Sequence, residues 1–394
     1  MQLRTLNDVD VSGRFVLLRD DFNVQIVDGK INDAFRIEQS MPTIRKLRDA
    51  GAKIAICAHL GRPKGERNME YTLKPIADYL NVPLIDDCLD KAFMDDMKDG
   101  DIVLLENVRF YPGEEKNDPE FVRQLADGFD IYVNDAFAVS HRAHASTVGV
   151  AEILHSYAGD LLVSKIEHLS MVIENPKRPL LGLVSGAKIK SKLGVIRALA
   201  KLCDHVIVAG GIGTSVHVAM GMTNIVMDEA NIEKSAEDEK NNQTIREIMT
   251  EYGDKIILPV EKGVGPAWER DAPRTDKMMA DIKPGDVVMD EGPASVAEYN
   301  RAIDNAATMV WNGTVGMAEW PPVWSRGTFA IAKHVAERSR DGKLISIIGG
   351  GDTVAALEAT NTKNDMTYVS TGGGAFMEFI EGIQLPGVAV LEKK

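Results

Sequence analysis

Glycine-rich segments recur directly after short apolar runs in this 394-residue sequence. Glycine triplets stand at residues 349–351 and 372–374, and a pair stands at residues 210–211. Glycines let backbone N–H groups approach phosphate oxygens, and a helix that follows adds its positive end. One triplet alone is as often a tight turn, and Asp352 and Thr353 after it could serve only as a helix N-cap. Three such segments together favour a polyphosphate site.

A different set of side chains follows the apolar runs of the first half. Arginine, histidine, asparagine and aspartate predominate, in Arg19-Asp20-Asp21-Phe22-Asn23, His59-Leu60-Gly61-Arg62-Pro63, Glu106-Asn107-Val108-Arg109-Phe110 and Asn134-Asp135, which leads to His141-Arg142-Ala143-His144. Guanidinium groups bind carboxylate and phosphate oxygens through paired hydrogen bonds. We therefore predict a small-anion site in this half.

A metal pair at His141 and His144 is disfavoured because no third ligand is evident nearby, and we expect His144 to be structural.

Lys188 and Lys192 stand four residues apart near the start of a predicted helix. Two like charges at that spacing repel each other, and they lie near the positive end of the helix dipole. Surface lysines are commonly just solvated. A bound anion would remove the conflict, so we favour a functional role for both.

The elements that must position these residues alternate short apolar runs with longer amphipathic segments, which predicts an α/β fold with mainly parallel strands. The predicted strands cover residues 15–18, 53–58, 82–85, 102–105, 131–133, 179–184, 205–208, 256–259, 287–289, 309–311, 344–348 and 368–369. A helical apolar pattern at 158–174 ends at Asn175-Pro176 and is the predicted domain link. We expect two doubly wound parallel-sheet, Rossmann-like domains joined by this hinge helix, with ligands at the carboxyl ends of the strands.

The composition excludes several classes of protein. The formal net charge of −14 argues against nucleic acid or an anionic membrane as a partner, because both need a basic face. No apolar run approaches the ~18 residues of a membrane helix, and the first residues lack the apolar core of a secretory signal. The three cysteines, Cys57, Cys88 and Cys203, are far apart and fit free thiols in a reducing cytoplasm.

Two unlike anion sites and no evident nucleophilic serine or cysteine point to direct transfer of a phosphoryl group. The chain has no P-loop and no protein-kinase signature. Residues 211–216 lack the third small residue of the dinucleotide fingerprint, which weakens the alternative of a nicotinamide-dependent dehydrogenase. A non-catalytic two-domain binding protein would explain an anion site, but not the two lysines or the three glycine segments.

The motifs resemble those of the phosphoglycerate kinase family over nearly the whole chain. In the first half the matching segments are Asp21-Phe22-Asn23, His59-Leu60-Gly61-Arg62-Pro63, Glu106-Asn107-Val108-Arg109-Phe110 and Asn134-Asp135-Ala136-Phe137 with His141-Arg142-Ala143-His144. In the second half they are Gly186-Ala187-Lys188, Trp311-Asn312-Gly313, Gly349-Gly350-Gly351-Asp352-Thr353, Ser370-Thr371-Gly372-Gly373-Gly374 and Leu385-Pro386-Gly387. The resemblance implies a glycolytic, cytoplasmic hinge enzyme that interconverts 1,3-bisphosphoglycerate plus ADP with 3-phosphoglycerate plus ATP, with Mg²⁺. It implies in-line transfer across a closing interdomain cleft.

The resemblance also implies roles for individual residues. The phosphoglycerate would be held by Asp21, Phe22, Asn23, Arg36, His59, Leu60, Gly61, Arg62, Arg109 and Arg142. The nucleotide would be held by Lys188, Lys192, Glu319, Gly350, Gly351, Asp352 and Thr353, with Glu319 on the ribose and Asp352 near the metal. For charge neutralisation in the transfer we expect Arg36 and Lys188, assisted by the N–H groups around Gly372 and Gly373.

The expected domains are residues 1–160 for phosphoglycerate and residues 161–382 for the nucleotide, with the linking helix 158–174. The tail, residues 383–394, is expected to pack on the first domain, and we expect a monomer. The chain departs from the family pattern at Asp20, Gln25, Ser185, Gly213, Glu291 and Thr314; aliphatic residues are usual at positions 20 and 291. Most departures lie in the nucleotide half, so they bear on base preference and nucleotide affinity.

Overall fold

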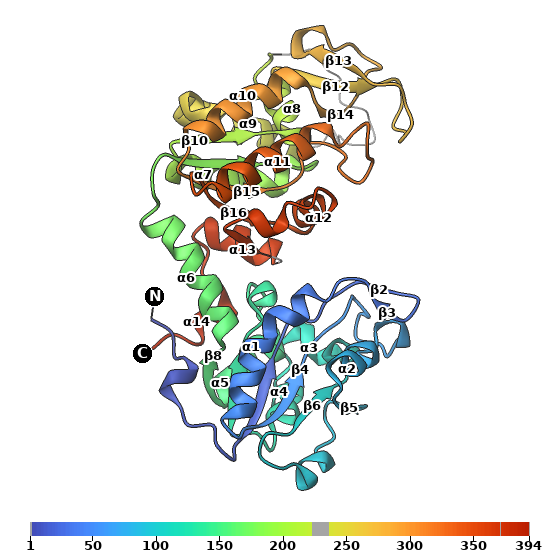
Figure 1. The fold of residues 1–394 in the computed structure, drawn as a ribbon, viewed down its shortest axis with the longest axis vertical. Coiled ribbons are helices and arrows are strands. Elements are labelled where there is room, and N and C mark those ends of the chain that lie inside the picture. The colour runs from blue at the N-terminus through green and yellow to red at the C-terminus, as the bar shows by residue number, and fades with distance from the viewer. Residues whose placement is uncertain (1, 223–235, 371, 394) are drawn as a thin grey trace. The chain divides into compact units, whose positions relative to one another are not determined.

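The computed structural model describes residues 2–222, 236–370 and 372–393. The chain divides into two compact units (Figure 1). Unit 1 is Met1–His168 with Ile383–Lys394, and unit 2 is Leu169–Gly382. The division falls inside helix α6 (Asp160–Glu174), eight residues after the boundary expected at residue 160. Across the three described ranges, no helix is both long and apolar enough to span a bilayer.

Unit 1 is built on a six-stranded parallel sheet with the order β5-β6-β4-β1-β7-β8. Its strands are β1 (Phe15–Arg19), β4 (Lys53–Cys57), β5 (Leu84–Ile85), β6 (Ile102–Leu105), β7 (Ile131–Asn134) and β8 (His155–Ala158). A short hairpin of β2 (Ile26–Val27) and β3 (Lys30–Ile31) follows β1. Its helices are α1 (Phe35–Asp49), α2 (Lys74–Leu80), α3 (Pro112–Lys116), α4 (Pro119–Ala126), α5 (Val150–Ile153) and α14 (Pro386–Ala389).

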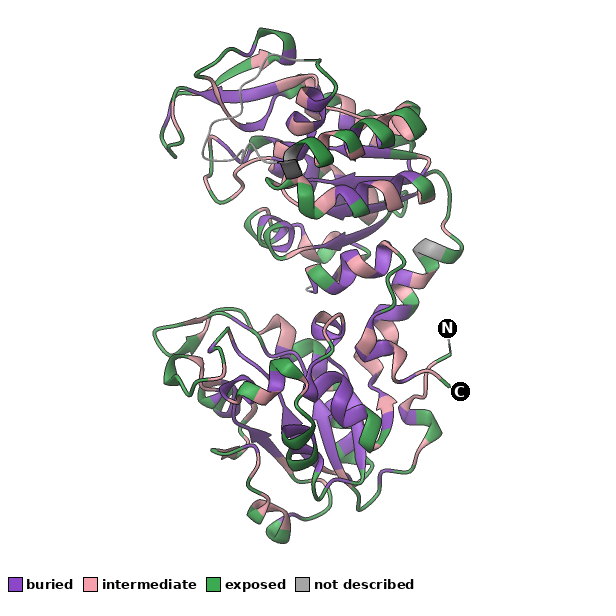
Figure 2. Cartoon of the chain, turned by 180° about the vertical axis from the view of Figure 1, so that it is seen from behind, coloured by how far each residue is buried: buried purple, intermediate pink, exposed green. Residues whose placement is uncertain are grey.

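The central strands of this sheet are apolar on both faces, and Figure 2 shows them buried. Val16 and Leu18 pack into one core with Ile54. Leu17, which points to the other face, packs into a second core with Ala55. Parallel strands covered by helices on both sides have this uninterrupted apolar sequence. The polar side chains are thereby confined to the ends of the strands.

The C-terminal segment belongs to unit 1. The Arg4 guanidinium donates to the Val390 carbonyl over 2.6 Å. The Gly387 N–H donates to the Ser140 carbonyl over 2.8 Å, and the Asn134 amide donates to the Gly387 carbonyl over 3.0 Å. These bonds join the C-terminal segment to the N-terminal residues, to the end of β7 and to the loop after it. Lys394, the last residue of the expected tail, lies outside the described residues.

Unit 2 contains a second six-stranded parallel sheet with the order β11-β10-β9-β15-β16-β17. Its strands are β9 (Leu180–Val184), β10 (His205–Val208), β11 (Ile256–Ile257), β15 (Thr308–Asn312), β16 (Ile345–Gly349) and β17 (Tyr368–Ser370). Its helices are α7 (Leu193–Leu202), α8 (Gly210–Ala219), α9 (Ala236–Tyr252), α10 (Pro293–Asn305), α11 (Arg326–Arg340), α12 (Gly351–Ala359) and α13 (Gly373–Ile380). The three glycine segments connect β10 to α8, β16 to α12 and β17 to α13, all at one sheet edge. Thr371 of the last segment lies outside the described residues.

The predicted doubly wound α/β architecture is confirmed, with two local corrections. Residues 287–289 were expected as a strand of the parallel set, but β14 (Val287–Glu291) lies in a separate antiparallel sheet with β12 (Glu261–Gly265) and β13 (Thr275–Met278). The expected helix start at residue 158 is also wrong. His155–Ala158 forms β8 at the sheet edge, and the helix begins at Asp160.

Candidate functional site

In unit 1, the carboxyl end of β1 brings Asp21 to Arg36 in the first turn of α1. The Arg36 guanidinium donates to the Asp21 carboxylate. Burial is the largest single effect and opposes ionisation of Asp21, but the charge of Arg36 and those of neighbouring residues together outweigh it and hold the pKa of Asp21 at about 2. Asp21 is therefore an anion at neutral pH, and it fixes the guanidinium of Arg36.

The neighbouring strand ends meet around Gly61. The Asn23 side chain accepts the Gly61 N–H over 2.9 Å, and the Arg109 guanidinium donates to the Gly61 carbonyl over 2.8 Å. Gly61 has φ +62°, and a Cβ there would lie 2.3 Å from the Tyr71 ring, so a larger residue would not fit. Arg62 next to it is exposed, whereas Phe22 and Leu60 are buried in the core beneath.

Positive charge accumulates at this edge. Burial, together with the Arg19 and Arg109 charges, holds the pKa of His59 well below its usual range, and the Arg19 guanidinium lies 3.1 Å from its ring. Burial and Arg19 lower the pKa of Arg109 to about 10. Burial, Arg109 and Arg142 lower that of His144 to about 4. Positive charges that lie this close together repel one another, so a bound anion would be attracted to them.

His144 is buried, and its Nδ1 lies 3.8 Å from Oε1 of the buried Glu114 carboxylate. Glu114 also accepts the Ser146 hydroxyl over 2.6 Å and the Ser146 N–H over 2.9 Å. Ser146 in turn accepts a bond from Arg19 over 2.8 Å. The Nδ1 of His144 has no hydrogen-bond partner among the described residues, so His144 lies beside this internal polar network without a hydrogen bond from Nδ1 into it.

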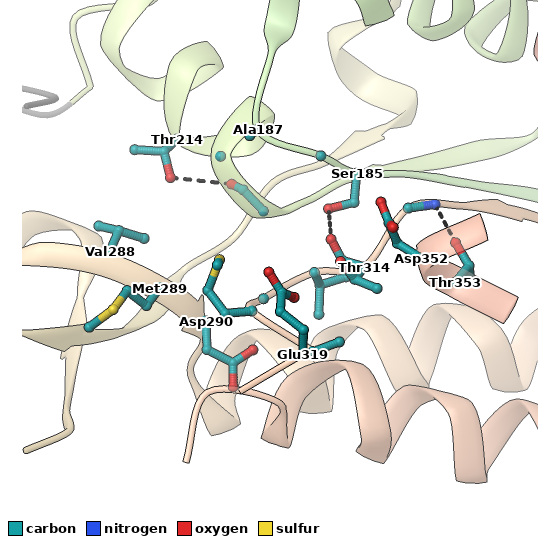
Figure 3. Close-up of a pocket in the computed structure, with 18 of the residues that line it drawn as sticks. Ser185, Ala187, Thr214, Val288, Met289, Asp290, Thr314, Glu319, Asp352 and Thr353 are labelled. Atoms are coloured by element: carbon teal, nitrogen blue, oxygen red, sulfur yellow. Dashed lines mark hydrogen bonds between the residues drawn. The ribbon is translucent and has the colours of Figure 1, made fainter. Parts of the chain in front are cut away.

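In unit 2, a cavity of about 2040 Å³ lies over the carboxyl edge of the sheet. Of the residues predicted for the nucleotide and for catalysis, Lys192, Glu319, Gly350, Asp352, Thr353 and Gly373 line it. Figure 3 shows Glu319 coming to this cavity from one segment and the neighbouring residues Asp352 and Thr353 from another, α12. Gly351 and Gly372 lie in the same turns as lining residues, but not in the wall itself.

The glycine turns of this cavity are in close contact. Gly350 has φ +101°, and a Cβ there would lie 2.9 Å from the Asn312 amide nitrogen. A Cβ on Gly373 would lie 3.1 Å from the Cα of Gly350. The Thr353 hydroxyl accepts the Gly313 N–H over 2.8 Å (Figure 3). The two turns can pack this closely only because neither carries a side chain.

The two lysines differ in their surroundings. Lys192 is partly buried at the N-cap of α7, and its ammonium donates to the side-chain oxygen Oδ1 of Asn312 over 2.9 Å. Burial lowers the pKa of Lys192, opposed by the charges of Glu381 and Asp352. Lys188 is exposed at the N-cap of the short 3-10 helix Ile189–Lys192, and it is not among the residues that line the cavity.

Asp352 is the carboxylate that could share a metal ion with a bound polyphosphate. It lies exposed in the first turn of α12, on the cavity wall. Within residues 2–222, 236–370 and 372–393, no group of three or more His, Cys, Asp or Glu could hold a metal ion by itself. A single carboxylate fits Mg²⁺, which commonly takes one or two protein carboxylates and completes its shell with phosphate oxygens and water.

Sequence reasoning missed Lys262 of β12, which lines the cavity although its side chain is fully buried. Glu291 was noted only as a departure from the family pattern. The structure pairs the two at 2.7 Å. Lys262 lies in a strand of low apolar content, and Glu291 follows an apolar run as other polar residues do, so neither could be separated from solvated surface residues.

Comparison with known proteins agrees with this geometry. A family model described as phosphoglycerate kinase matches residues 6–383. The phosphoglycerate kinases of Bartonella quintana (strain Toulouse) and Brucella abortus biovar 1 (strain 9-941) are each 43% identical to this chain, and each alignment covers 100% of both proteins. The structure of phosphoglycerate kinase from Coxiella burnetii matches with a TM-score of 0.84 at 36% identity, over 99% of this chain and 98% of that one. That of Pyrococcus horikoshii OT3 matches with a TM-score of 0.85 at 27% identity, over 99% and 98%. The chain therefore belongs to the phosphoglycerate kinase family, and it transfers a phosphoryl group between 1,3-bisphosphoglycerate plus ADP and 3-phosphoglycerate plus ATP in glycolysis.

Proposed function

We propose that the two units divide the substrates of this kinase, with 3-phosphoglycerate on unit 1 and the nucleotide on unit 2. The observation that carries this assignment is the contrast between the two sheet edges. Arg19, Arg109 and Arg142 concentrate positive charge at one. At the other, the turns at Gly350 and Gly373 expose backbone on a cavity wall. Guanidinium groups suit a carboxylate and a terminal phosphate, and bare N–H groups suit a polyphosphate.

The phosphoglycerate site follows from the contacts of unit 1. Arg62, Arg109 and Arg142, with His59 and Asn23, supply donors for the two anionic ends of the substrate. Asp21 holds Arg36 in position through their ion pair. Phe22, Leu60 and Gly61 shape the backbone beneath these donors. In this arrangement the substrate anion neutralises the cations that crowd this edge.

The nucleotide site uses the cavity of unit 2. Gly350, Gly351 and Thr353 present the amino end of α12 to the phosphates, and Lys192 and Lys188 add positive charge. Glu319 accepts hydrogen bonds from the ribose hydroxyls. Asp352 holds Mg²⁺ together with phosphate oxygens, and the ion supplies neutralisation of the phosphate charge. For Lys188 to reach the phosphates, its exposed side chain must turn toward the cavity.

The transfer itself requires no general base, because the acceptor is a carboxylate already ionised at neutral pH. Catalysis then depends on positioning the substrates and on neutralising the negative charge on the equatorial oxygens of the phosphoryl group during transfer. We assign that neutralisation to Arg36 and Lys188, with the N–H groups of Gly372 and Gly373. Because these residues belong to different units, the units must close to bring the reacting atoms within ~3–3.5 Å. A cytoplasmic location and a monomeric state stay predictions.

The division of substrates is tested by steady-state kinetics with a coupled assay for ATP-dependent phosphorylation of 3-phosphoglycerate. Arg62→Ala should raise the KM for 3-phosphoglycerate by about tenfold or more and leave that for ATP within about twofold. Glu319→Ala should do the reverse. Lys98→Ala removes an exposed lysine just before β6, at the opposite end of the unit 1 strands, and should change neither constant. If either of the first two variants shifted the other substrate's KM instead, the assignment would be wrong.

A further inference from the structure

Two opposite charges are fully buried beside the nucleotide cavity of unit 2. Lys262 of β12 and Glu291 of β14 are paired across the antiparallel ladder, and the solvent reaches neither side chain. The Lys262 ammonium lies 2.7 Å from Oε1 of Glu291. Burying two charges costs desolvation free energy that their attraction only partly offsets, and apolar pairs of similar size are often as stable or more so. Overall stability alone is therefore a poor explanation for this pair.

The pair holds both polar backbone groups of one glycine. Oε1 of Glu291 accepts the Gly210 N–H over 2.7 Å. The Lys262 ammonium donates to the Gly210 carbonyl over 2.9 Å. Gly210 has φ +63°, and a Cβ there would lie 2.5 Å from the Ser185 hydroxyl. Two short bonds thus fix Gly210, the residue at which the chain turns from β10 into α8.

This glycine is part of the cavity wall, together with Gly211, Ser185, Gly186 and Ala187. The Ile212 N–H donates to the Gly186 carbonyl over 3.0 Å, so the turn after β10 is bonded to the turn after β9. A Cβ on Gly211 would lie 3.2 Å from the Cα of Ala187. A displacement of Gly210 would therefore move both turns.

The second carboxylate oxygen of Glu291, Oε2, is buried and has no hydrogen-bond partner among the described residues. The carboxylate is thus satisfied only on the side that faces Lys262 and Gly210. Its bonds are directed at the turn rather than spread through the core. Such hydrogen bonds stabilise one backbone conformation of the turn relative to the others.

We propose that Lys262 and Glu291 are positioning residues for nucleotide binding, which hold the 210–211 turn without touching the nucleotide. This inference rests on the proposed nucleotide site in unit 2. It predicts that this enzyme's nucleotide affinity depends on the pair, whereas binding of 3-phosphoglycerate does not.

The decisive variant is the double substitution Lys262→Met with Glu291→Leu, which leaves no charge unpaired. We expect it to fold with a thermal midpoint near that of the wild type. The Kd for ADP, measured calorimetrically, should rise about fivefold or more, with the KM for 3-phosphoglycerate within about twofold. Amide exchange in residues 209–213 should become faster. Arg197→Met, which breaks an exposed ion pair between α7 and α9, is the control and should alter neither affinity.

A conservative substitution separates the effect of the hydrogen-bond geometry at Gly210 from the effect of the Glu291 charge. Glu291→Gln keeps an oxygen that can accept from Gly210 and Lys262, so ADP affinity should stay within about twofold of the wild type. If the double variant does not fold, Gly210→Ala disturbs the same turn and should also weaken ADP binding about fivefold or more. Wild-type ADP affinity in a folded double variant, or in Gly210→Ala, would overturn the inference. Failure of Glu319→Ala to weaken nucleotide binding would instead refute the nucleotide site itself.

Discussion

Replacing Asp20 by asparagine should stabilise unit 1 at neutral and alkaline pH. Asp20 is fully buried directly after β1. Its Oδ1 accepts the Ser40 hydroxyl and the Asp21 N–H, whereas Oδ2 is buried without a partner among the described residues. Burial, and then the Asp135 carboxylate, raise the pKa of Asp20 from its ordinary 3.8 to about 7, although the hydrogen bonds from Ser40 and the Asp21 N–H act in the opposite direction.

The direction in which stability changes with pH follows from the number of protons bound by the folded and the unfolded states. Between pH 3.8 and about 7 the folded protein keeps a proton that the unfolded chain has lost, so stability falls as the pH rises through this window. A shift of ~3 units at ~1.4 kcal/mol each sets an upper limit of ~4 kcal/mol. Because Asp20 and Asp135 share protons, we expect about 2–4 kcal/mol of stabilisation in Asp20→Asn at pH 8, and less than ~1 kcal/mol at pH 4.5. Asparagine retains an acceptor for Ser40 and Asp21.

Urea unfolding followed by far-UV circular dichroism at pH 4.5, 6 and 8 measures this difference. All four tryptophans, Trp268, Trp311, Trp320 and Trp324, lie in unit 2, so their fluorescence would not report on Asp20. Amide exchange of the β1 peptide supplies the local readout. Asp99→Asn, at an exposed site, is the control and should change nothing at any pH. Equal or lower stability of Asp20→Asn at pH 8, or a gain that does not vary with pH, would refute the reasoning.

Three further outcomes follow. Arg36→Ala should lower kcat in the coupled assay by at least roughly a hundredfold while the protein still folds, with a lower thermal midpoint because Asp21 loses its ion pair; a loss of kcat of tenfold or less would remove Arg36 from the catalytic role. The three buried thiols should not react with a thiol reagent in native protein at pH 8, since burial raises the pKa of Cys57 to about 12; rapid labelling would contradict that. Small-angle scattering should show compaction only when both substrates bind, and an unchanged radius would count against closure.

The parallel core could be predicted from the sequence because its strands are apolar runs. β1, β6 and β10 contain little else, and the polar residues after them mark the edge at which ligands bind. The small antiparallel sheet could not be predicted in this way. β13 is Thr-Asp-Lys-Met, and β12 contains two glycines and a charged pair, so neither shows strand periodicity. Their pairing depends on contacts distant in the sequence.

The candidate site shows the same division. Motif residues such as Asp21, Gly350 and Asp352 could be located because they directly follow strands. The hydrogen bonds that Lys262 and Glu291 make with Gly210 could not be predicted. They depend on the register between β12 and β14, which pairs residues 29 positions apart in the chain. The exposed position of Lys188 was likewise unpredictable, since spacing alone does not say which way a side chain points.

Hydrogen exchange on the wild-type enzyme with one ligand at a time tests the division of substrates between the units most directly. With 3-phosphoglycerate alone, protection should appear at residues 21–23, 59–62 and 107–110 and be absent from unit 2. With ADP and Mg²⁺, it should appear at residues 209–213, 350–353 and 372–374 and be absent from unit 1. Protection by both ligands at the same strand ends, or the reversed pattern, would contradict the account.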